Sequence, residues 1–142
     1  TWAGTPAGCA AGLKTLEIYE RDNVVENAAR LGDVAADIMG KWESYDVVRQ
    51  VRLNGLLMGV SIQSPDDDEK DEWYAKAIRS RMLDNGVWAI SDREVHVRLY
   101  PALNMDEAVL RDGLSRMEEA IAHVDKHGQD LGDTPMLPTG MI

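Results

Sequence analysis

Residues 95–124 read VHVRLYPALNMDEAVLRDGLSRMEEAIAHV and pass directly from a strand pattern to a helix pattern. In the first six residues, valine and leucine alternate with His96, Arg98 and Tyr100. This period of two predicts a strand with one buried apolar face and one polar face. Pro101 is expected to end the strand, because proline cannot donate a backbone hydrogen bond. The sequence therefore predicts that Arg98 lies on the polar face of a sheet.

The helix pattern that follows is strongly amphipathic. Asn104 is expected to cap this helix, with Glu107 three residues later as in a capping box. Gly128 is expected to end it. The apolar positions step by three and four, which predicts one stripe facing a core. This stripe consists of Leu110, Leu114, Met117, Ile121 and Val124.

Two upstream stretches also have strand character. VWAI (87–90) followed by SDRE (91–94) predicts a short strand and a turn, paired antiparallel with the strand at 95–100. YDVVRQVRLNGLLMGVSI (45–62) predicts two strands around an Asn-Gly turn. The second of these strands is expected to be buried on both faces. Its Gly59 is expected to mark a bulge or a close backbone contact.

The other periodic segments predict helices. Residues 7–20 are rich in alanine and glycine, so this helix is expected to pack closely against a neighbour. Asp22 is expected to cap a second helix whose apolar stripe spans 24–42. A third helix at 73–82 is expected to end at Asn85-Gly86. Together the elements predict an α+β fold of two layers, in which helices cover a mainly antiparallel sheet.

Length and charge limit the function. The chain has 142 residues, enough for one domain with a modest core. Its net charge of −10 argues against nucleic acid and against an anionic membrane surface as partners. Six acidic residues within SPDDDEKDE (64–72) predict a solvated loop that enters a helix N-terminus. A divalent-metal site is the alternative for this loop.

The single cysteine, Cys9, excludes an internal disulfide and fits a reducing compartment. Its alanine and glycine neighbours favour a buried, inert thiol. No apolar run reaches membrane-spanning length and no secretory signal is present, so a cytoplasmic location is expected by default.

Motifs of catalysis and metal binding are not found in the sequence. His123 and His127 share a helix face, which we interpret as a solvated helix end, with zinc ligation as the alternative. There is no P-loop, no GxGxxG and no GxSxG. The sequence therefore predicts no catalytic residue and no metal ligand within this chain.

Two features could bind an anion. Arg98 on a rigid strand could hold a carboxylate through two parallel hydrogen bonds, and an ion pair with a nearby acid is the alternative. The opening turn, TWAGTP (1–6), places a threonine hydroxyl and backbone N–H groups before a helix, as in an anion cradle. An ordinary helix cap gives the same pattern.

Four blocks of sequence carry a family resemblance. They are TWAGTPAGCAAGLKTLEIYERDNVVENAARLG (1–32), VRQVRLNGLLMGVSI (48–62), MLDNGVWAI (82–90) and VHVRLYPALNMDEAVLRDGLSRMEEAI (95–121). In this order they resemble the C-terminal part of class III, fold-type I pyridoxal-phosphate aminotransferases. Two positions depart from the family pattern: Thr5 replaces the usual Asn or His, and Leu53-Asn54 replaces Gly-x.

The resemblance implies a domain organisation and two site residues. Residues 1–43 would lead from a large cofactor domain, 44–128 would form the small C-terminal α+β domain, and 129–142 would be a tail without a match. Thr1 would bind the phosphate of the cofactor, typically that of the neighbouring subunit in a homodimer. Arg98 would face the substrate carboxylate or gate its entry. The Schiff-base lysine would lie upstream, and no lysine of this chain takes that role.

The implied activity of the intact enzyme is transamination with pyridoxal 5′-phosphate, between an amine or amino acid and a keto acid. This chain alone is expected to be inactive. Racemase, aminomutase or decarboxylase chemistry of the same fold stays open, as does a stand-alone binding domain that has lost the cofactor.

Overall fold

The computed structural model describes residues 4–92 and 95–128, and within them an antiparallel four-stranded sheet of order β1-β2-β4-β3. The strands are β1 (Val48–Asn54), β2 (Leu57–Ile62), β3 (Ile90–Asp92) and β4 (His96–Leu99). The helices are α1 (Pro6–Arg21), α2 (Val24–Met39), η1 (Gly40–Ser44), η2 (Asp68–Lys70), α3 (Asp71–Asp84) and α4 (Glu107–His127). The predicted α+β class and antiparallel sheet are confirmed.

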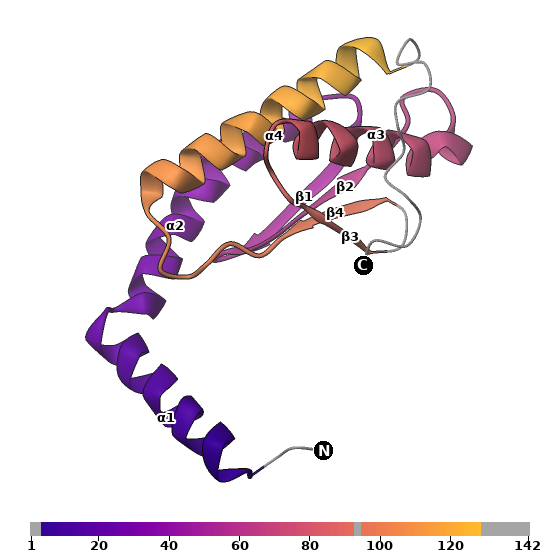
Figure 1. Ribbon diagram of the computed structural model, residues 1–142. Coiled ribbons are helices and arrows are strands. Elements are labelled where there is room, and N and C mark those ends of the chain that lie inside the picture. Colours follow the sequence, from indigo (N-terminus) through magenta and orange to yellow (C-terminus); the bar gives the residue numbers. More distant parts are fainter. Residues whose placement is uncertain (1–3, 93–94, 129–142) are drawn as a thin grey trace.

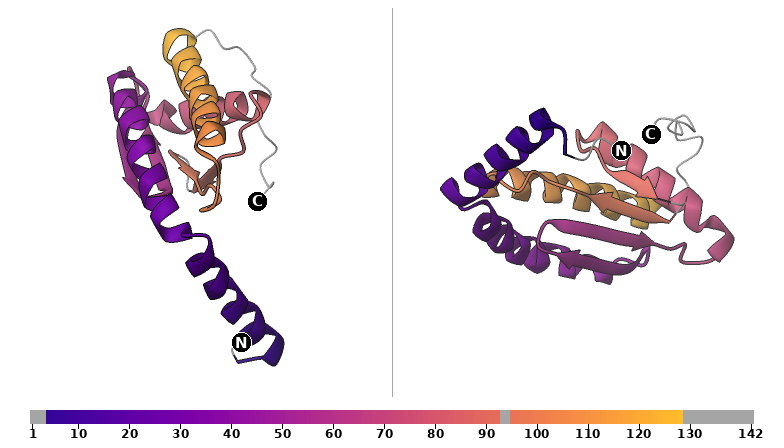
Figure 2. Two further views of the ribbon diagram at one scale, coloured as in Figure 1. Left: turned by 90° about the vertical axis from the view of Figure 1, so that its left-hand side faces the viewer. Right: turned by 90° about the horizontal axis from the view of Figure 1, so that it is seen from below.

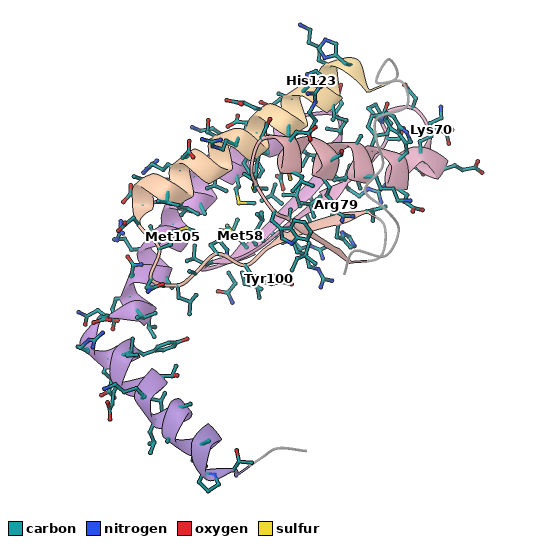
Figure 3. The ribbon with its side chains drawn as sticks, viewed as in Figure 1. Met58, Lys70, Arg79, Tyr100, Met105 and His123 are labelled. Atoms are coloured by element: carbon teal, nitrogen blue, oxygen red, sulfur yellow. The ribbon has the colours of Figure 1, made fainter. Side chains whose placement is uncertain are left out.

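The molecule has two layers. Figure 1 shows α2, α3 and α4 on one side of the sheet, while no described helix covers the other side. In Figure 2, α1 extends away from both layers. The helix-facing residues of β2 and β4 are apolar and buried, and Met58 of β2 lies opposite Leu99 of β4. In Figure 3, Met58 lies on the helix side of the sheet and Tyr100 on the other. We call the uncovered side the open face.

The core lies between the sheet and the helices. The predicted stripe of α4 is confirmed, since all five of its residues are buried. From α2 and η1, Leu31, Ala35, Met39 and Trp42 enter the same core. Segment 24–42 therefore packs with the sheet, and the predicted division between 1–43 and 44–128 stays a prediction. The predicted tail, 129–142, lies outside the described residues.

Two predicted helix caps are wrong. Asp22 lies at the C-terminal end of α1, and its carboxylate forms an ion pair with Arg21 at 2.6 Å. The residue that precedes α2 is Asn23, which has the left-handed backbone conformation. The N-cap position of the last helix is Asp106 and not Asn104, because a turn from Ala102 to Met105 occupies that segment first; the Asp106 side chain makes no capping hydrogen bond. The backbone N–H of Met105 donates to the carbonyl of Ala102 at 3.0 Å.

The strands differ from expectation in three ways. β3 spans Ile90–Asp92 and not 87–90, so the first two residues of the predicted SDRE turn, Ser91 and Asp92, belong to the strand. The bulge lies in β1 between Val48 and Gln50, and Gly59 pairs regularly, so the predicted bulge at Gly59 is wrong. Burial of the 56–62 strand on both faces is also wrong, because one face is open and Leu57 is 59% exposed.

The third predicted helix and its end are confirmed. α3 ends at Asp84, and Gly86 follows with a φ of 81°, a conformation that suits glycine. Searched over the described residues alone, the chain contains no helix with the length and apolarity of a membrane span.

Candidate functional site

The open face of the sheet carries Arg98. Strand pairing places Arg98 opposite Gly59 of β2, and Gly59 lies in turn opposite Arg52 of β1. Ile90 of β3 lies on the other side of Arg98. Because directly opposed residues share one face of a sheet, these four residues form a row across the strands. We call Arg52, Gly59 and Arg98 the arginine row.

A second polar row lies beside the first. Ser61 pairs with His96 in the sheet, and Ser61 Oγ lies 3.0 Å from His96 Nδ1. On β1, the side chain of Gln50 accepts hydrogen bonds from Arg52 at 2.8 Å from Nε and 2.5 Å from the terminal nitrogen. The open face is therefore polar and cationic at its centre, in contrast to the apolar helix-facing side.

The placement of Arg98 on the polar side of its strand is confirmed. Val97 and Leu99 are buried against the helices, whereas Arg98 is half-buried on the open face. β4 pairs with a strand on each side, so the backbone that carries Arg98 is held firmly. The role of Arg98 toward a carboxylate stays a prediction. Thr1, the predicted phosphate ligand, lies outside the described residues.

None of the lysines shares the open face with Arg98. All five lie in helices, at Lys14, Lys41, Lys70, Lys76 and Lys126. Lys14 pairs with Glu17 at 2.7 Å along α1, and Lys76 forms an ion pair with Glu72 along α3. The described residues therefore form no complete site for a cofactor that is bound through a lysine imine.

A polar network, which sequence reasoning missed, fixes the connection from β4 to α4. The Asn27 amide nitrogen donates to the carbonyl oxygens of Leu103 at 2.9 Å and Met105 at 3.3 Å. Arg30 donates to the Asn27 side-chain oxygen at 3.0 Å and forms an ion pair with Glu107. Hydrogen bonds from Arg111 and Arg30 lower the pKa of the Glu107 carboxyl. This network ties α2 to the segment that follows the Arg98 strand.

The two histidines of α4 contact a cation and not a metal-ligand set. Arg81 of α3 lies 2.5 Å from His123 Nε2. Because a guanidinium always donates, His123 accepts through Nε2 and keeps its proton on Nδ1. His127 Nδ1 lies 3.1 Å from the carbonyl oxygen of His123. Within 4–92 and 95–128, no three His, Cys, Asp or Glu side chains gather as a metal site.

We expect the His123–Arg81 contact to make stability depend on pH. Burial, then Arg81, lower the pKa of His123 below 6.5. The unfolded chain therefore binds the proton first, so the free energy of unfolding should fall as pH drops below about 6.5. Urea unfolding of the natural chain and of His123→Gln at several pH values on both sides of about 6.5 would measure this pH dependence. The free energy of unfolding of His123→Gln should fall less steeply with decreasing pH than that of the natural chain. His96→Gln is the control, and equal pH dependence for the natural chain and both variants would contradict the expectation.

The acidic stretch at 64–72 enters a helix N-terminus, as predicted. Asp71 is buried at the start of α3, accepts a hydrogen bond from the Ser64 backbone N–H at 2.6 Å and pairs with Arg49 at 2.8 Å. Asp67 caps the turn before it, with Glu69 N donating at 3.1 Å. These contacts give two of its acidic residues a structural role.

Cys9 is exposed, so its predicted burial is wrong. The physical reason is that α1 buries none of its residues against the described chain. Leu13 and Leu16 on the same helix are 65% and 61% exposed. The close neighbour predicted for the small-residue helix is not found among the described residues.

Comparison with known proteins places these features in a family. The model of the family Aminotransferase class-III matches residues 1–121. The chain is 30% identical over 129 residues to a leucine/methionine racemase of Thermococcus litoralis, covering 89% of this chain and 29% of that protein. It is 31% identical over 121 residues to the mitochondrial ornithine aminotransferase of Rattus norvegicus, covering 85% of this chain and 26% of that protein.

The fold agrees with solved structures. The acetylornithine aminotransferase of Elizabethkingia anophelis superposes with a TM-score of 0.72 at 27% identity, covering 83% of this chain and 29% of that one. The chain thus spans less than a third of the length of these relatives. The predicted resemblance is confirmed by a family match over most of the sequence and by the shared fold. The chain therefore belongs to the class-III aminotransferase family.

Proposed function

We propose that this chain is the small C-terminal domain of a pyridoxal-phosphate enzyme that moves an amino group between an amine or amino acid and a keto acid. Family membership supports the reaction class. The coverage of 29% or less of the relatives' length supports a larger enzyme that supplies the remaining machinery. The observation that carries the proposal is the position of Arg98 on the open face of the sheet.

In this proposal, Arg98 binds and orients the substrate. A guanidinium offers two parallel N–H donors to a carboxylate, which fixes both the position and the orientation of the bound acid. β4 pairs with a strand on each side, so its backbone is already ordered. Binding therefore costs little further conformational entropy of the backbone. Pyridoxal phosphate, when bound, would supply the electron-withdrawing ring. The described residues hold and orient the substrate and form no complete site for the cofactor.

Racemisation is the second candidate function. The 30% identity to a leucine/methionine racemase favours it, since that relative covers 89% of this chain. Arg98 could bind an amino acid carboxylate in either reaction. The assembly of the intact enzyme as a homodimer is also part of the proposal, and the family resemblance supports it. A cytoplasmic location is proposed as well, because a single cysteine fits a reducing compartment.

Product analysis of the intact gene product tests the proposal. The purified enzyme, supplied with pyridoxal phosphate, would be incubated with an amino donor and a keto acid, and the products separated by chiral chromatography. We expect a new amino acid and a new keto acid in equal amounts, and visible-region imine absorbance that this chain alone lacks. Inversion of the donor without transfer would favour the racemase, and an active, coloured chain of 142 residues would contradict the proposal.

A further inference from the structure

We propose that one end of the open face is the surface on which the rest of the intact enzyme, the polypeptide ahead of Thr1, docks. This apolar end consists of Leu57, Trp88, Ile90 and Tyr100. The inference rests on the proposed function, which requires that further polypeptide, and goes beyond it by assigning the contact to named residues. It leaves Arg98 in its assigned role toward the substrate carboxylate.

Two of these side chains come from β3 and the segment before it. Ile90 lies on the open face because it pairs directly with Arg98. Val87 and Ala89 pack against the core on the helix side. Because successive side chains of an extended segment alternate in direction, Trp88 points to the open face.

The other two come from the neighbouring strands. Met58 of β2 pairs with Leu99 of β4, and both are buried on the helix side. Leu57 and Tyr100, the adjacent residues on these strands, therefore lie side by side on the open face. Figure 3 shows Tyr100 on this side of the sheet. The apolar end thus extends across β2, β4 and the segment that leads into β3.

The apolar end is exposed to a degree that suits a protein contact. Its four side chains are each between 46% and 61% exposed, and no described helix covers them. Single exposed apolar residues are common on proteins, but these four adjoin one another. Tryptophan and tyrosine are also enriched in the buried centres of protein interfaces. We therefore expect this surface to be covered in the intact enzyme.

The path of the chain indicates what covers it. In Figure 1, α1 runs from its junction with α2 past the sheet, to the side that the open face points to. Polypeptide that enters α1 thus comes from the space in front of the open face. α1 buries none of its own residues against the described chain. The matched stretch makes up 29% of the racemase and 26% of the ornithine aminotransferase, so an enzyme of their size has ample polypeptide to cover the apolar end.

Other occupants suit the surface less well. A second copy of this chain also carries a net charge of −10, so two copies repel each other. The same charge disfavours an anionic membrane surface. Trp88 and Tyr100 alone can bury about 300–500 Å² in a contact, which requires a partner larger than an amino acid.

Docking at the apolar end would place Arg98 at the seam between two parts of the enzyme. Ile90 lies directly opposite Arg98, so the arginine borders the covered area. Ligand sites are common at such boundaries between domains. The docked polypeptide would exclude water from one side of the guanidinium, which strengthens its hydrogen bonds to a carboxylate. Substrate binding would then depend on assembly of the intact enzyme.

Hydroxyl-radical footprinting of the natural sequence tests the docking surface without a substitution. Radicals oxidise exposed side chains, and mass spectrometry measures the rate at each residue in the 142-residue chain and in the intact gene product loaded with pyridoxal phosphate. We expect Trp88 and Tyr100 to be oxidised at least about tenfold more slowly in the intact enzyme, because the reaction then requires local opening. The fully buried Trp42 gives the rate of a protected tryptophan in both proteins. Val109 of α4, 56% exposed, is the control and should react equally in both.

Trp88→Ser tests whether the contact stabilises the intact enzyme. In the 142-residue chain, the Tm should change by less than about 1 °C, because the side chain is exposed there. In the intact enzyme, the Tm should fall by about 3 °C or more, and Trp88→Phe should lower it less. Val109→Ser is the matched control and should leave the Tm of both proteins within about 1 °C of the natural value.

Three results would overturn the inference. They are equal oxidation of Trp88 and Tyr100 in the chain and the intact enzyme, an equal effect of Trp88→Ser on the Tm of both, or protection in the chain alone that grows with its concentration. The last result would assign the surface to a second copy.

The two proposals can fail separately. A gene product that transfers amino groups while Trp88 and Tyr100 stay as reactive as in the chain would remove this inference alone. Protection of both residues in a gene product that transfers no amino group would remove the proposed function alone.

Discussion

Replacing Trp42 by alanine should lower the free energy of unfolding by about 3–5 kcal/mol, as removal of a fully buried aromatic side chain does. Trp42 has no exposed surface and belongs to the core cluster. It lies in η1, which contacts both α2 and β1 and so joins the helix layer to the sheet. Its loss would leave a cavity where the two layers meet.

Phenylalanine at this position should cost much less, about 1 kcal/mol, because it keeps most of the buried apolar surface. In the part of the chain that the structure describes, the buried indole N–H of Trp42 has no hydrogen-bond partner. Phenylalanine removes this unsatisfied donor, and that gain offsets part of the lost volume. Urea unfolding followed by circular dichroism would measure both variants. Trp88→Phe is the control, since Trp88 is 61% exposed. Equal losses for Trp42→Phe and Trp42→Ala would contradict the expectation.

Gly32→Ala should destabilise the domain by about 2 kcal/mol, although alanine favours a helix over glycine by about 1 kcal/mol. The added Cβ would lie 2.6 Å from the Cα of Gly55 and 3.1 Å from its carbonyl oxygen. Both are backbone atoms of the turn between β1 and β2, so no side-chain rotation relieves the contact. The helix and the turn would have to move apart.

The matched control is Gly12→Ala in α1, whose Cβ would meet nothing within 4 Å. It should leave the free energy of unfolding unchanged or raise it by up to about 1 kcal/mol. Urea unfolding of both variants would measure the difference between their free energies of unfolding. A Gly32→Ala variant as stable as the natural chain would show that α2 does not lie against the β1–β2 turn as described.

The strongly periodic segments could be predicted from sequence because burial selects their residues. The stripe of α4 and the alternation of β4 both follow the side that faces the core, and the structure agrees at Val97, Leu99 and Leu110. Helix caps were harder to predict from the sequence, because more than one polar residue near a helix terminus can occupy the cap position. Asn104 and Asp106 both suit a cap, and a turn that forms before the helix decided between them.

The arginine row could not be read from sequence because it depends on register. If Asn54 and Gly55 were the two central turn residues, as in a common hairpin, Arg52 would lie opposite Leu57. The structure pairs Asn54 with Leu57, so the turn is made by Gly55-Leu56 and Arg52 moves opposite Gly59. This change of register decides whether Arg52 lies opposite Leu57, two residues along β2 from the residue that Arg98 faces, or opposite Gly59, which Arg98 also faces. Arg98 alone was predictable, from the period of its own strand.

The most direct test of the account is the effect of Arg98→Gln in the intact enzyme on two amine substrates that differ only in a carboxylate. We expect kcat/KM for the carboxylate-bearing amine to fall about 100-fold, which corresponds to loss of about 3 kcal/mol from a charged hydrogen-bonded pair. For the amine without a carboxylate, kcat/KM should change less than about threefold. An equal loss for both amines, or no loss for either, would contradict the assignment of the open face to the substrate.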